Sequence, residues 1–554
     1  MVATIPSLWQ DVLDKGLTTP AYLEEQEDGW REVSWTEAAG RVEALGRALR
    51  ARGIGHGDAV AVVARTRLEW LLLDWAIMSI GAVVVGLYPS NTASECRYIL
   101  EHCDAALVFV ENDEQHDKVA SVFSGPIVRF AEIAQFEDEG RAYDGPPASP
   151  VSADDVATLI YTSGTTGPPK GVILTHRNLV TAASRATSAT DEDDIVLLFL
   201  PMAHSFARIA HQGSAFNGAT VALVSDVARV PEALQRTRPT FLPAVPRVYE
   251  KIHANVLGEI ERSSSAKRAI GRFALAVGGR ASRLRRAGRT VPPALRVQEK
   301  LADRLVFAKV RARLGGRLRL GVSGAAPLGI DVLEFFHSLG MLVIEGYGLT
   351  ETSSSLSVND PDDYRFGTVG HAVDGCDVRL DSDGEILVRS DTIFSGYYKD
   401  PDATAAAFTA DGWFRTGDVG ELDDEGWLKI TDRKKDLIIT AGGKNIAPQN
   451  LENALKASRF VSQAVVVGDR RPYVTALITL DPAEVAGTGR DAEEIVQEIV
   501  EEVNRDRVRV EQIKRFAILP RDFSQEEGEL TPTLKLRRKI VHEHFADEIE
   551  NLYA

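Results

Sequence analysis

The segment Tyr161–Gly171 has the sequence YTSGTTGPPKG, whose residue types suit the binding of a polyphosphate. Glycine lets the backbone approach a ligand closely, and N–H and O–H groups donate hydrogen bonds to phosphate oxygens. The apolar runs Val156–Tyr161 and Val172–Leu174 predict a strand on each side of this loop. The groups expected around the phosphates are those of Thr162, Ser163, Gly164, Thr165, Thr166, Gly167 and Lys170.

This loop differs from a Walker A motif, in which four residues separate the first glycine from Gly-Lys and a Ser or Thr follows the lysine. Here Pro168 and Pro169 precede Lys170, and Gly171 follows it. A flexible turn between two strands is the alternative interpretation, but two prolines restrict the backbone and disfavour it. The segment therefore indicates a phosphate-binding loop of another kind.

Three further motifs follow in order: Gly346–Thr352 (GYGLTET), Trp413–Asp418 (WFRTGD) and Asp432–Asp436 (DRKKD). Together with the first loop they resemble the acyl-adenylating enzymes, which include acyl- and aryl-CoA synthetases, luciferases and the adenylation domains of peptide synthetases. The resemblance extends from residue 161 to Lys535. It implies ATP, Mg²⁺ and coenzyme A as the cofactor and co-substrates.

The resemblance also implies which residues contact the nucleotide. Glu351 would hold Mg²⁺ together with Thr162, since this hard cation takes oxygen ligands. Asp418 would accept hydrogen bonds from both ribose hydroxyls. Lys170 would contact the β and γ phosphates. The other nucleotide contacts implied are Gly324 and Ala325 on one side of adenine, Gly346 and Tyr347 on the other, and Glu345, Gly348, Thr350 and Arg433 nearby.

Three residues receive catalytic roles by the same resemblance. Lys535, in the motif Leu530–Lys535 (LTPTLK), matches the family's catalytic lysine. Lys435 would lie at a hinge. His204 follows an apolar, strand-like run, and in the family the matching histidine lies beside the acyl site; a structural histidine is the alternative. The glycines expected to line the coenzyme A channel are Gly442 and Gly443.

The segment Phe241–Ile252 (FLPAVPRVYEKI) resembles the long-chain fatty acid branch of the family. The resemblance thus implies ATP-dependent, AMP-forming ligation of a long-chain fatty acid to coenzyme A through an acyl-adenylate. An acyl-AMP ligase that delivers to a carrier protein is one alternative, and a luciferase-type oxygenase another. A catalytically silent nucleotide-binding sensor is an alternative from a different class.

Length and composition indicate a globular protein with more than one domain. The chain has 554 residues, of which 44% are apolar and 26% charged. Three cysteines without metal-ligand spacing, and a first segment unlike a signal peptide, predict a cytoplasmic protein. Asp74 interrupts the longest apolar stretch, Leu71–Tyr88, which predicts a buried helix that turns at Gly81 into the strand Ala82–Leu87.

Helical and strand-like segments alternate over residues 1–150. Trp35–Arg52 predicts a helix ended by Gly53, and Ala59–Ala64 and Leu107–Val110 predict strands. This alternation predicts an α/β fold with mostly parallel sheets flanked by helices, whose ligands bind at the carboxyl ends of the strands. Prolines within residues 137–155 predict a surface connection.

The expected domains are an N-terminal adenylation domain over residues 1–432 and a small, mobile α+β domain over residues 433–554. The charged run Asp432–Asp436 between two apolar segments predicts an exposed linker at this boundary. Beyond it, Ala464–Val467 and Val474–Thr479 predict strands, and Asp491–Arg507 predicts a helix.

Charge is distributed unevenly along the chain. The net charge is −17, which disfavours nucleic acid as a partner, yet residues 261–320 hold 17 lysines and arginines against three acids. A helical apolar pattern, formed by Val297, Leu301, Leu305, Ala308 and Ala312, ends at Gly315-Gly316. The segment is either a solvated basic helix or a site for anionic lipid or coenzyme A phosphates. Binding to lipid would make the protein peripheral to the inner face of the membrane.

Overall fold

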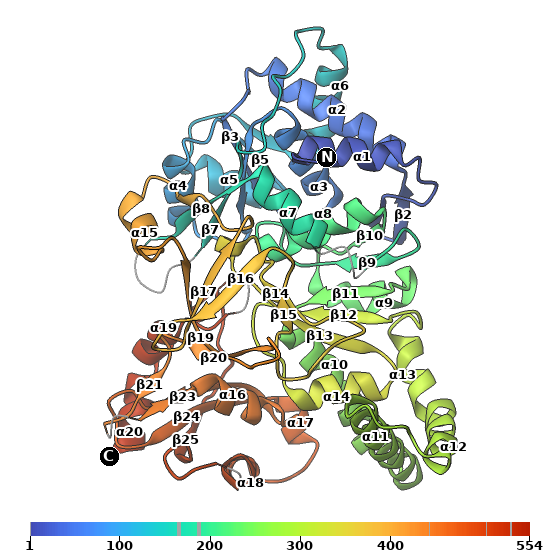
Figure 1. Ribbon diagram of the computed structural model, residues 1–554, viewed down its shortest axis with the longest axis vertical. Coiled ribbons are helices and arrows are strands. Elements are labelled where there is room, and N and C mark those ends of the chain that lie inside the picture. The colour runs from blue at the N-terminus through green and yellow to red at the C-terminus, as the bar shows by residue number, and fades with distance from the viewer. Residues whose placement is uncertain (1, 163–167, 186–189, 442–443, 506, 532–534) are drawn as a thin grey trace.

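The computed structural model describes residues 2–162, 168–185, 190–441, 444–505, 507–531 and 535–554. Two large sheets with flanking helices form its first three quarters (Figure 1). The first sheet is parallel from β7 to β6 and antiparallel at its β8 edge. Its strand order is β18 (Gly396–Tyr397), β8 (Lys170–Thr175), β7 (Val156–Thr162), β4 (Val83–Leu87), β3 (Ala59–Val63), β5 (Leu107–Val110) and β6 (Ile127–Arg129).

The second large sheet is parallel through its centre and antiparallel at both edges. These arrangements confirm the predicted mostly parallel α/β fold. The strand order is β15 (His371–Ala372), β14 (Ser357–Val358), β13 (Leu342–Tyr347), β12 (Leu320–Ser323), β11 (Phe241–Ala244), β9 (Ile195–Leu198), β10 (Thr220–Leu223), β1 (Tyr22–Gln26) and β2 (Gly29–Val33).

Helix boundaries follow local signals in the sequence. In α2 (Trp35–Ala51), the Ser34 side chain accepts the backbone N–H of Glu37, and Gly53 follows with a φ of 83°. The other helices of this region are α1 (Ile5–Asp14), α3 (Leu68–Ser79), α4 (Ala93–His102), α5 (Asp113–Ala120), α6 (Ile133–Ala142), α7 (His176–Arg185), α8 (Ser205–Asn217), α9 (Val230–Thr237), α10 (Pro246–Arg262), α11 (Ser265–Arg286), α12 (Pro293–Ala302), α13 (Ala308–Arg313) and α14 (Ile330–Ser338).

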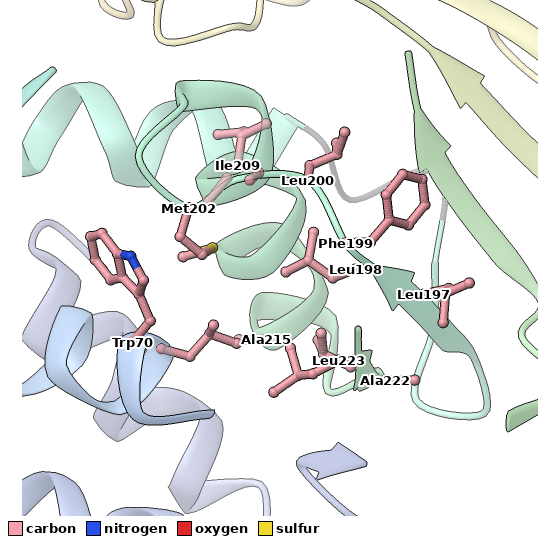
Figure 2. Packing of buried hydrophobic residues seen from close by; sticks show 14 of the residues in the cluster. Trp70, Leu197, Leu198, Phe199, Leu200, Met202, Ile209, Ala215, Ala222 and Leu223 are labelled. Carbon is pink, nitrogen blue, oxygen red and sulfur yellow. The ribbon is translucent and has the colours of Figure 1, made fainter. Parts of the chain in front are cut away.

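The main hydrophobic core lies where α3 and α8 pack beside the second sheet. Trp70 of α3, Met202 of the loop after β9 and Ile209 of α8 come together there (Figure 2). Helix α3 is apolar on nearly every side and buried along most of its length, as predicted for Leu71–Tyr88. This packing fixes the loop that leads from β9 to α8.

The prediction of a surface connection over residues 137–155 is wrong in its first part. Residues 137–142 continue α6, and Glu137 is buried, where it accepts a hydrogen bond from the Arg41 Nε at 2.8 Å. The helical pattern is short there, and the pairing partner Arg41 lies in a distant part of the sequence. The prolines of this segment all follow the helix, so they indicate a connection only after residue 142.

The last part of the chain forms smaller sheets, of which the sheet of β23, β24 and β25 lies at the lower left, in orange to red (Figure 1). They are β16 (Cys376–Leu380), β17 (Glu385–Ser390), β19 (Phe414–Leu422) and β20 (Leu428–Arg433); β21 (Ile438–Ile439) and β22 (Asn445–Ile446); and β23 (Val461–Val467), β24 (Val474–Leu480) and β25 (Ile513–Ile518). Their helices are α15 (Pro401–Ala406), α16 (Pro448–Lys456), α17 (Pro482–Ala486), α18 (Ala492–Arg505), α19 (Arg538–His544) and α20 (Ala546–Tyr553).

The charged run 432–436 is not exposed throughout, contrary to the prediction. Asp432 is buried within β20, where burial raises the pKa of its carboxyl to about 6. Only Arg433, Lys434 and Lys435 of this run are exposed, the last two in the turn after the strand. In the described residues, no helix is long and apolar enough to cross a membrane.

Candidate active site

A large cavity, about 2410 Å³ in volume, lies at the carboxyl ends of strands from both large sheets. Strand β7 ends at Thr162, β12 leads to Gly324, and β13 ends at Tyr347. All three residues line the cavity. The strand ends therefore bring together motifs that lie far apart in the sequence, as expected for an α/β fold.

Asp418 forms the polar centre of the cavity together with Tyr347 and Arg433. The Tyr347 hydroxyl donates to Asp418 Oδ2 at 2.6 Å, and the Arg433 Nε lies 3.4 Å from Asp418 Oδ1. Arg433 stands opposite Asp418 because β19 and β20 pair at these two residues. Burial raises the pKa of the Asp418 carboxyl, although Arg433 opposes the shift.

Lys535 reaches the same cavity from near the end of the sequence. Its segment is held by reciprocal contacts with Thr531: the Thr531 N–H donates to the Lys535 carbonyl at 2.8 Å, and the Lys535 N–H donates to Thr531 Oγ1 at 3.0 Å. Burial and the charge of Arg433 lower the pKa of Lys535 to about 8, while Asp418 and Glu351 act in the opposite direction. The charges of Arg433, Asp418 and Glu351 therefore act on this ammonium group.

Glu351 lies in the short 3₁₀ turn Thr350–Thr352 and lines the cavity. The Tyr397 hydroxyl donates to Glu351 Oε1 at 2.9 Å. The ammonium of Lys170 lies 4.9 Å from the centre of the Tyr397 ring and 3.7 Å from Asp400 Oδ2. One tyrosine thus connects the predicted metal ligand to the predicted phosphate ligand.

The backbone is closely packed at the two turns predicted to enclose adenine. Ala325 has a φ of 74°, a strained value for a residue with a side chain. A Cβ at Gly324 would lie 3.2 Å from the Phe206 ring, and one at Gly348 would collide with the Ser354 backbone. Close backbone approach therefore explains both glycines.

Glu345 is buried beside these turns. It accepts the Leu328 N–H at 2.9 Å, and burial raises the pKa of its carboxyl to about 7. Its backbone carbonyl accepts the Asn359 N–H at 3.1 Å. Glu345 therefore links β13 to the turn after β12. Thr350, also predicted as a nucleotide contact, lines the cavity and is buried.

His204 caps α8 at the cavity wall, where its Nδ1 accepts the Phe206 N–H at 3.2 Å. Burial and the positive charge of Lys535 lower the pKa of the imidazole to about 3, which keeps it neutral at physiological pH. Beyond it, α8 and β11 form an apolar wall of the cavity. The lining residues there are Ile209, Ala210, Gly213, Phe241 and Pro243.

The structure does not bring every predicted residue into the polar centre. Lys435 is exposed in the turn between β20 and β21, at the margin of the cavity. The predicted residues Ser163, Gly164, Thr165, Thr166, Gly167, Gly442 and Gly443 lie outside the described residues. Gly346, by contrast, lines the cavity with Tyr347.

Sequence reasoning missed Tyr397 and Phe206 as site residues. Tyr397 reaches Glu351 because β18 pairs with β8, with Tyr397 opposite Val172 across the strands. No local motif signals a pairing over this sequence distance. Phe206 had a signal, since it belongs to the predicted segment around His204, but nothing in the sequence connects it to Gly324.

Residues 10–398 match the AMP-binding enzyme family, and residues 435–554 match the AMP-binding enzyme C-terminal domain. The chain belongs to the AMP-binding enzyme family. This AMP-binding enzyme is 39% identical to the long-chain-fatty-acid–CoA ligase FadD15 of Mycobacterium bovis, over 95% of this chain and 92% of the relative. The predicted family resemblance is therefore confirmed.

Solved structures share the fold of this AMP-binding enzyme. The adenylation domain of a carboxylate reductase from Mycobacterium chelonae aligns with a TM-score of 0.81 at 24% identity, covering 99% of this chain and 91% of that one. ATP-bound MatB from Rhodopseudomonas palustris aligns with a TM-score of 0.74 at 24% identity, covering 99% and 100%. These similarities confirm the mixed α/β fold with a smaller C-terminal part.

Proposed function

We propose that this chain is a long-chain fatty acid–CoA ligase that forms AMP and passes through an acyl-adenylate. The observation that carries the proposal is one cavity in which Lys535, Asp418 and Glu351 adjoin the apolar wall of α8 and β11. A polar centre suits ATP, and an apolar wall suits an acyl chain. The 39% identity to a relative named as such a ligase supports the same conclusion.

In the first step, a fatty acid carboxylate attacks the α-phosphorus of ATP and pyrophosphate leaves. Lys535 bridges the carboxylate and an α-phosphate oxygen, so that its charge offsets the repulsion between the two anions. Asp418 accepts the ribose hydroxyls and positions the nucleotide. Lys170 and the loop from Thr162 to Thr166 hold the β and γ phosphates. No residue of the chain forms a covalent intermediate.

The residues around Glu351 fit a magnesium ion. Among the described residues only the Tyr397 hydroxyl hydrogen-bonds the Glu351 carboxylate, which leaves oxygen lone pairs for a cation. Glu351 and Thr162 would hold the ion, with phosphate oxygens as its other ligands. Bound there, Mg²⁺ would supply charge neutralisation for the phosphates.

In the second step, the coenzyme A thiolate attacks the acyl carbonyl and AMP leaves. We assign this step to a second orientation of the domain 433–554 relative to the domain 1–432, reached by a turn at Lys435 that removes Lys535 from the cavity. Gly442 and Gly443 then line the coenzyme A channel. Exposure of Lys435 in a turn supports its role as a hinge.

A coupled assay of AMP release, with coenzyme A and fatty acids from short to very long chains, tests the proposal. Long chains should give the highest kcat/KM, and AMP release should require coenzyme A. Release that instead requires a carrier protein would identify an acyl-AMP ligase. Absence of ATP–pyrophosphate exchange with every acid would identify a nucleotide sensor and contradict ligase activity.

The enzyme works as a cytoplasmic protein held at the inner face of the membrane, where long-chain fatty acids concentrate. The excess of base over acid in residues 261–320 supports this location, because the cytoplasmic leaflet carries anionic lipid. Coenzyme A phosphates are the competing anionic ligand of that segment.

A further inference from the structure

Residues 265–313 form a helical hairpin at one corner of the molecule, away from the cavity. Helix α11 packs against α12 and α14, and the π-helical turn η4 (Asp303–Phe307) joins α12 to α13. The hairpin occupies the lower right of the molecule, with α12 on its outer side (Figure 1). The buried apolar residues of α12 and η4 are Leu295, Ala302 and Phe307.

The apolar pattern found in the sequence faces away from this packing. Val297, Leu301 and Leu305 are 69%, 50% and 37% exposed, whereas the apolar face of an amphipathic helix usually covers a core. Because they are four residues apart, they form a ridge along one side of α12 and η4. Ile270 and Phe273 of α11 are exposed as well.

These exposures are concentrated in the hairpin. Eleven large apolar side chains are exposed in the described part of the chain, and five of them lie in residues 265–313. A large exposed apolar patch on a protein surface indicates an interaction site, whereas single exposed apolar residues need no explanation.

A row of basic residues runs beside the ridge. Arg296, Lys300 and Arg304 each precede one ridge residue, and all three are exposed. In residues 261–320, eight of the 17 basic side chains make no ion pair with any described residue, and all eight are exposed. They are Lys267, Arg280, Arg289, Arg296, Lys300, Arg304, Lys309 and Arg317.

The three acids of the segment do not offset this charge, since each is paired. Glu299 binds Arg285 at 2.8 Å, Asp303 binds Arg311 at 2.6 Å, and Glu261 binds Arg272 at 2.6 Å. The outer side of the hairpin therefore combines unpaired positive charge with exposed aliphatic side chains.

We infer that the ridge of Val297, Leu301 and Leu305, together with the basic row of Arg296, Lys300 and Arg304 beside it, docks this protein onto an anionic lipid bilayer. Basic residues attract the headgroups, and aliphatic residues enter the boundary between headgroups and acyl chains. Nucleic acid fits less well, because the ridge has no aromatic side chain to stack on bases. Docking would help to capture a membrane-dissolved substrate only if the proposed ligase function holds. The evidence for the docking surface does not depend on that function.

Sedimentation of the full chain with vesicles tests the inference without any substrate. Vesicles of phosphatidylglycerol and phosphatidylcholine in equal parts should bind the protein, pure phosphatidylcholine vesicles should not, and added salt should release it. The variant Arg296→Gln/Lys300→Gln/Arg304→Gln should bind about 100-fold more weakly, about fivefold for each charge. The variant Val297→Ser/Leu301→Ser/Leu305→Ser should also lose binding, through loss of the apolar contact.

A matched control removes three exposed basic residues elsewhere: Arg97→Gln/Arg490→Gln/Arg509→Gln. It changes the net charge equally and should bind as the unaltered protein does. Equal loss of vesicle binding in the control and the ridge variants would overturn the inference. Full binding by either ridge variant would also overturn it, and so would a lack of binding by the unaltered protein at low salt. Ligation of a long-chain fatty acid, supplied without vesicles and below its micelle-forming concentration, should be unchanged in the ridge variants. Its absence from the unaltered protein would contradict the ligase proposal alone.

Discussion

The buried position of Lys535 makes its positive charge destabilise the folded protein. The pKa of its ammonium is about 8 in the folded protein against an ordinary value of 10.5, so the folded state binds the proton less tightly than the unfolded chain. The charge therefore destabilises the fold below about pH 8, and this cost disappears as the pH rises from about 8 to 10.5. Such a cost is typical of a residue retained for chemistry.

Replacement of Lys535 by methionine should separate stability from activity. We expect the free energy of unfolding at pH 7 to rise by as much as about 3 kcal/mol, since the buried charge is gone. ATP–pyrophosphate exchange should fall by at least about 100-fold, because one charge-stabilising donor is lost. Denaturant unfolding and exchange assays measure the two effects. A variant that is both less stable and fully active would contradict the role of Lys535.

The pH dependence of adenylate formation should report the protonation of Lys535. If charged Lys535 bridges the two anions, kcat/KM for adenylate formation should decrease as the pH rises through about 8 in the free enzyme. The variant Lys535→Arg keeps its charge to a much higher pH, so its profile should lose this decrease even where its absolute rate is lower. A decrease at the same pH in both proteins would assign the titration to another group.

Tyr397 should matter for the use of the metal. The change Tyr397→Phe removes the hydroxyl that donates to Glu351 but keeps the ring beside Lys170. We expect a higher Mg²⁺ concentration for half-maximal rate, by about tenfold or more, from loss of one hydrogen bond to a charged group. Glu351→Gln should have a larger effect of the same kind. An unchanged Mg²⁺ dependence in both variants would exclude Glu351 as the metal carboxylate.

At the scale of elements, α3 and α8 are joined by an ion pair within the apolar core. Arg208 of α8 lies 2.9 Å from Asp74 of α3, and both side chains are at most 1% exposed. The Arg208 Nε also donates to the Met202 carbonyl at 3.3 Å, just before His204. The pair thus connects α3 to the loop that positions His204.

The single change Arg208→Met should destabilise the protein by about 3–5 kcal/mol, because it leaves the Asp74 carboxylate buried without its partner. The double variant Asp74→Leu/Arg208→Met should recover much of that loss, since two apolar side chains then fill the site. Thermal and denaturant unfolding of both variants and of Asp74→Leu provide the comparison. Additive losses in the double variant would show that the two charges do not stabilise each other.

Signals from neighbouring residues predicted the helices and strands well. The features that these signals missed depend on contacts between distant parts of the sequence. Gly53 ends α2, and α3 and β4 follow the apolar pattern on either side of Gly81. These features depend on neighbours in the sequence. Asp74 interrupted an apolar run in the sequence, but its partner Arg208 belongs to a distant helix and no local pattern reveals the pairing.

The residues of the candidate site also fall into those that the sequence identified and those that only long-range contacts reveal. Motif resemblance identified Asp418, Glu351 and Lys535, and the structure brings all three to one cavity. It did not identify Tyr397, whose position depends on an edge strand pairing with β8. The exposed direction of the α12 apolar pattern was also missed, because periodicity shows that residues share a face but not what covers it.

At the scale of the whole molecule, polar contacts join residues 435–554 to the rest of the chain. Glu484 of α17 is bound both by Arg262 of α10 and by Arg459, and the Arg247 guanidinium donates to Ser462 Oγ at 3.1 Å. The arginines of these contacts, Arg262 and Arg247, are 53% and 43% exposed, and partly exposed pairs contribute little stability. A change of orientation between the two parts would therefore cost little.

Lys435→Pro tests the proposed hinge. Proline locks the φ angle of its own residue, so the turn after β20 should lose its freedom to change conformation. We expect ATP–pyrophosphate exchange to persist, while thioester formation from added acyl-adenylate and coenzyme A falls by at least about tenfold. Lys535→Ala should show the reverse. Equal loss of both half-reactions in both variants would contradict the two-orientation proposal.

The route by which Lys535 reaches the cavity has a consequence for the newly made protein. Thr162, Glu351 and Asp418 all leave the ribosome before Lys535. Domains generally fold as units, the N-terminal one first during synthesis. A nascent chain that ends before Lys535 should therefore hold ATP without consuming it, so no acyl-adenylate should be made and released before Lys535 has been added to the chain.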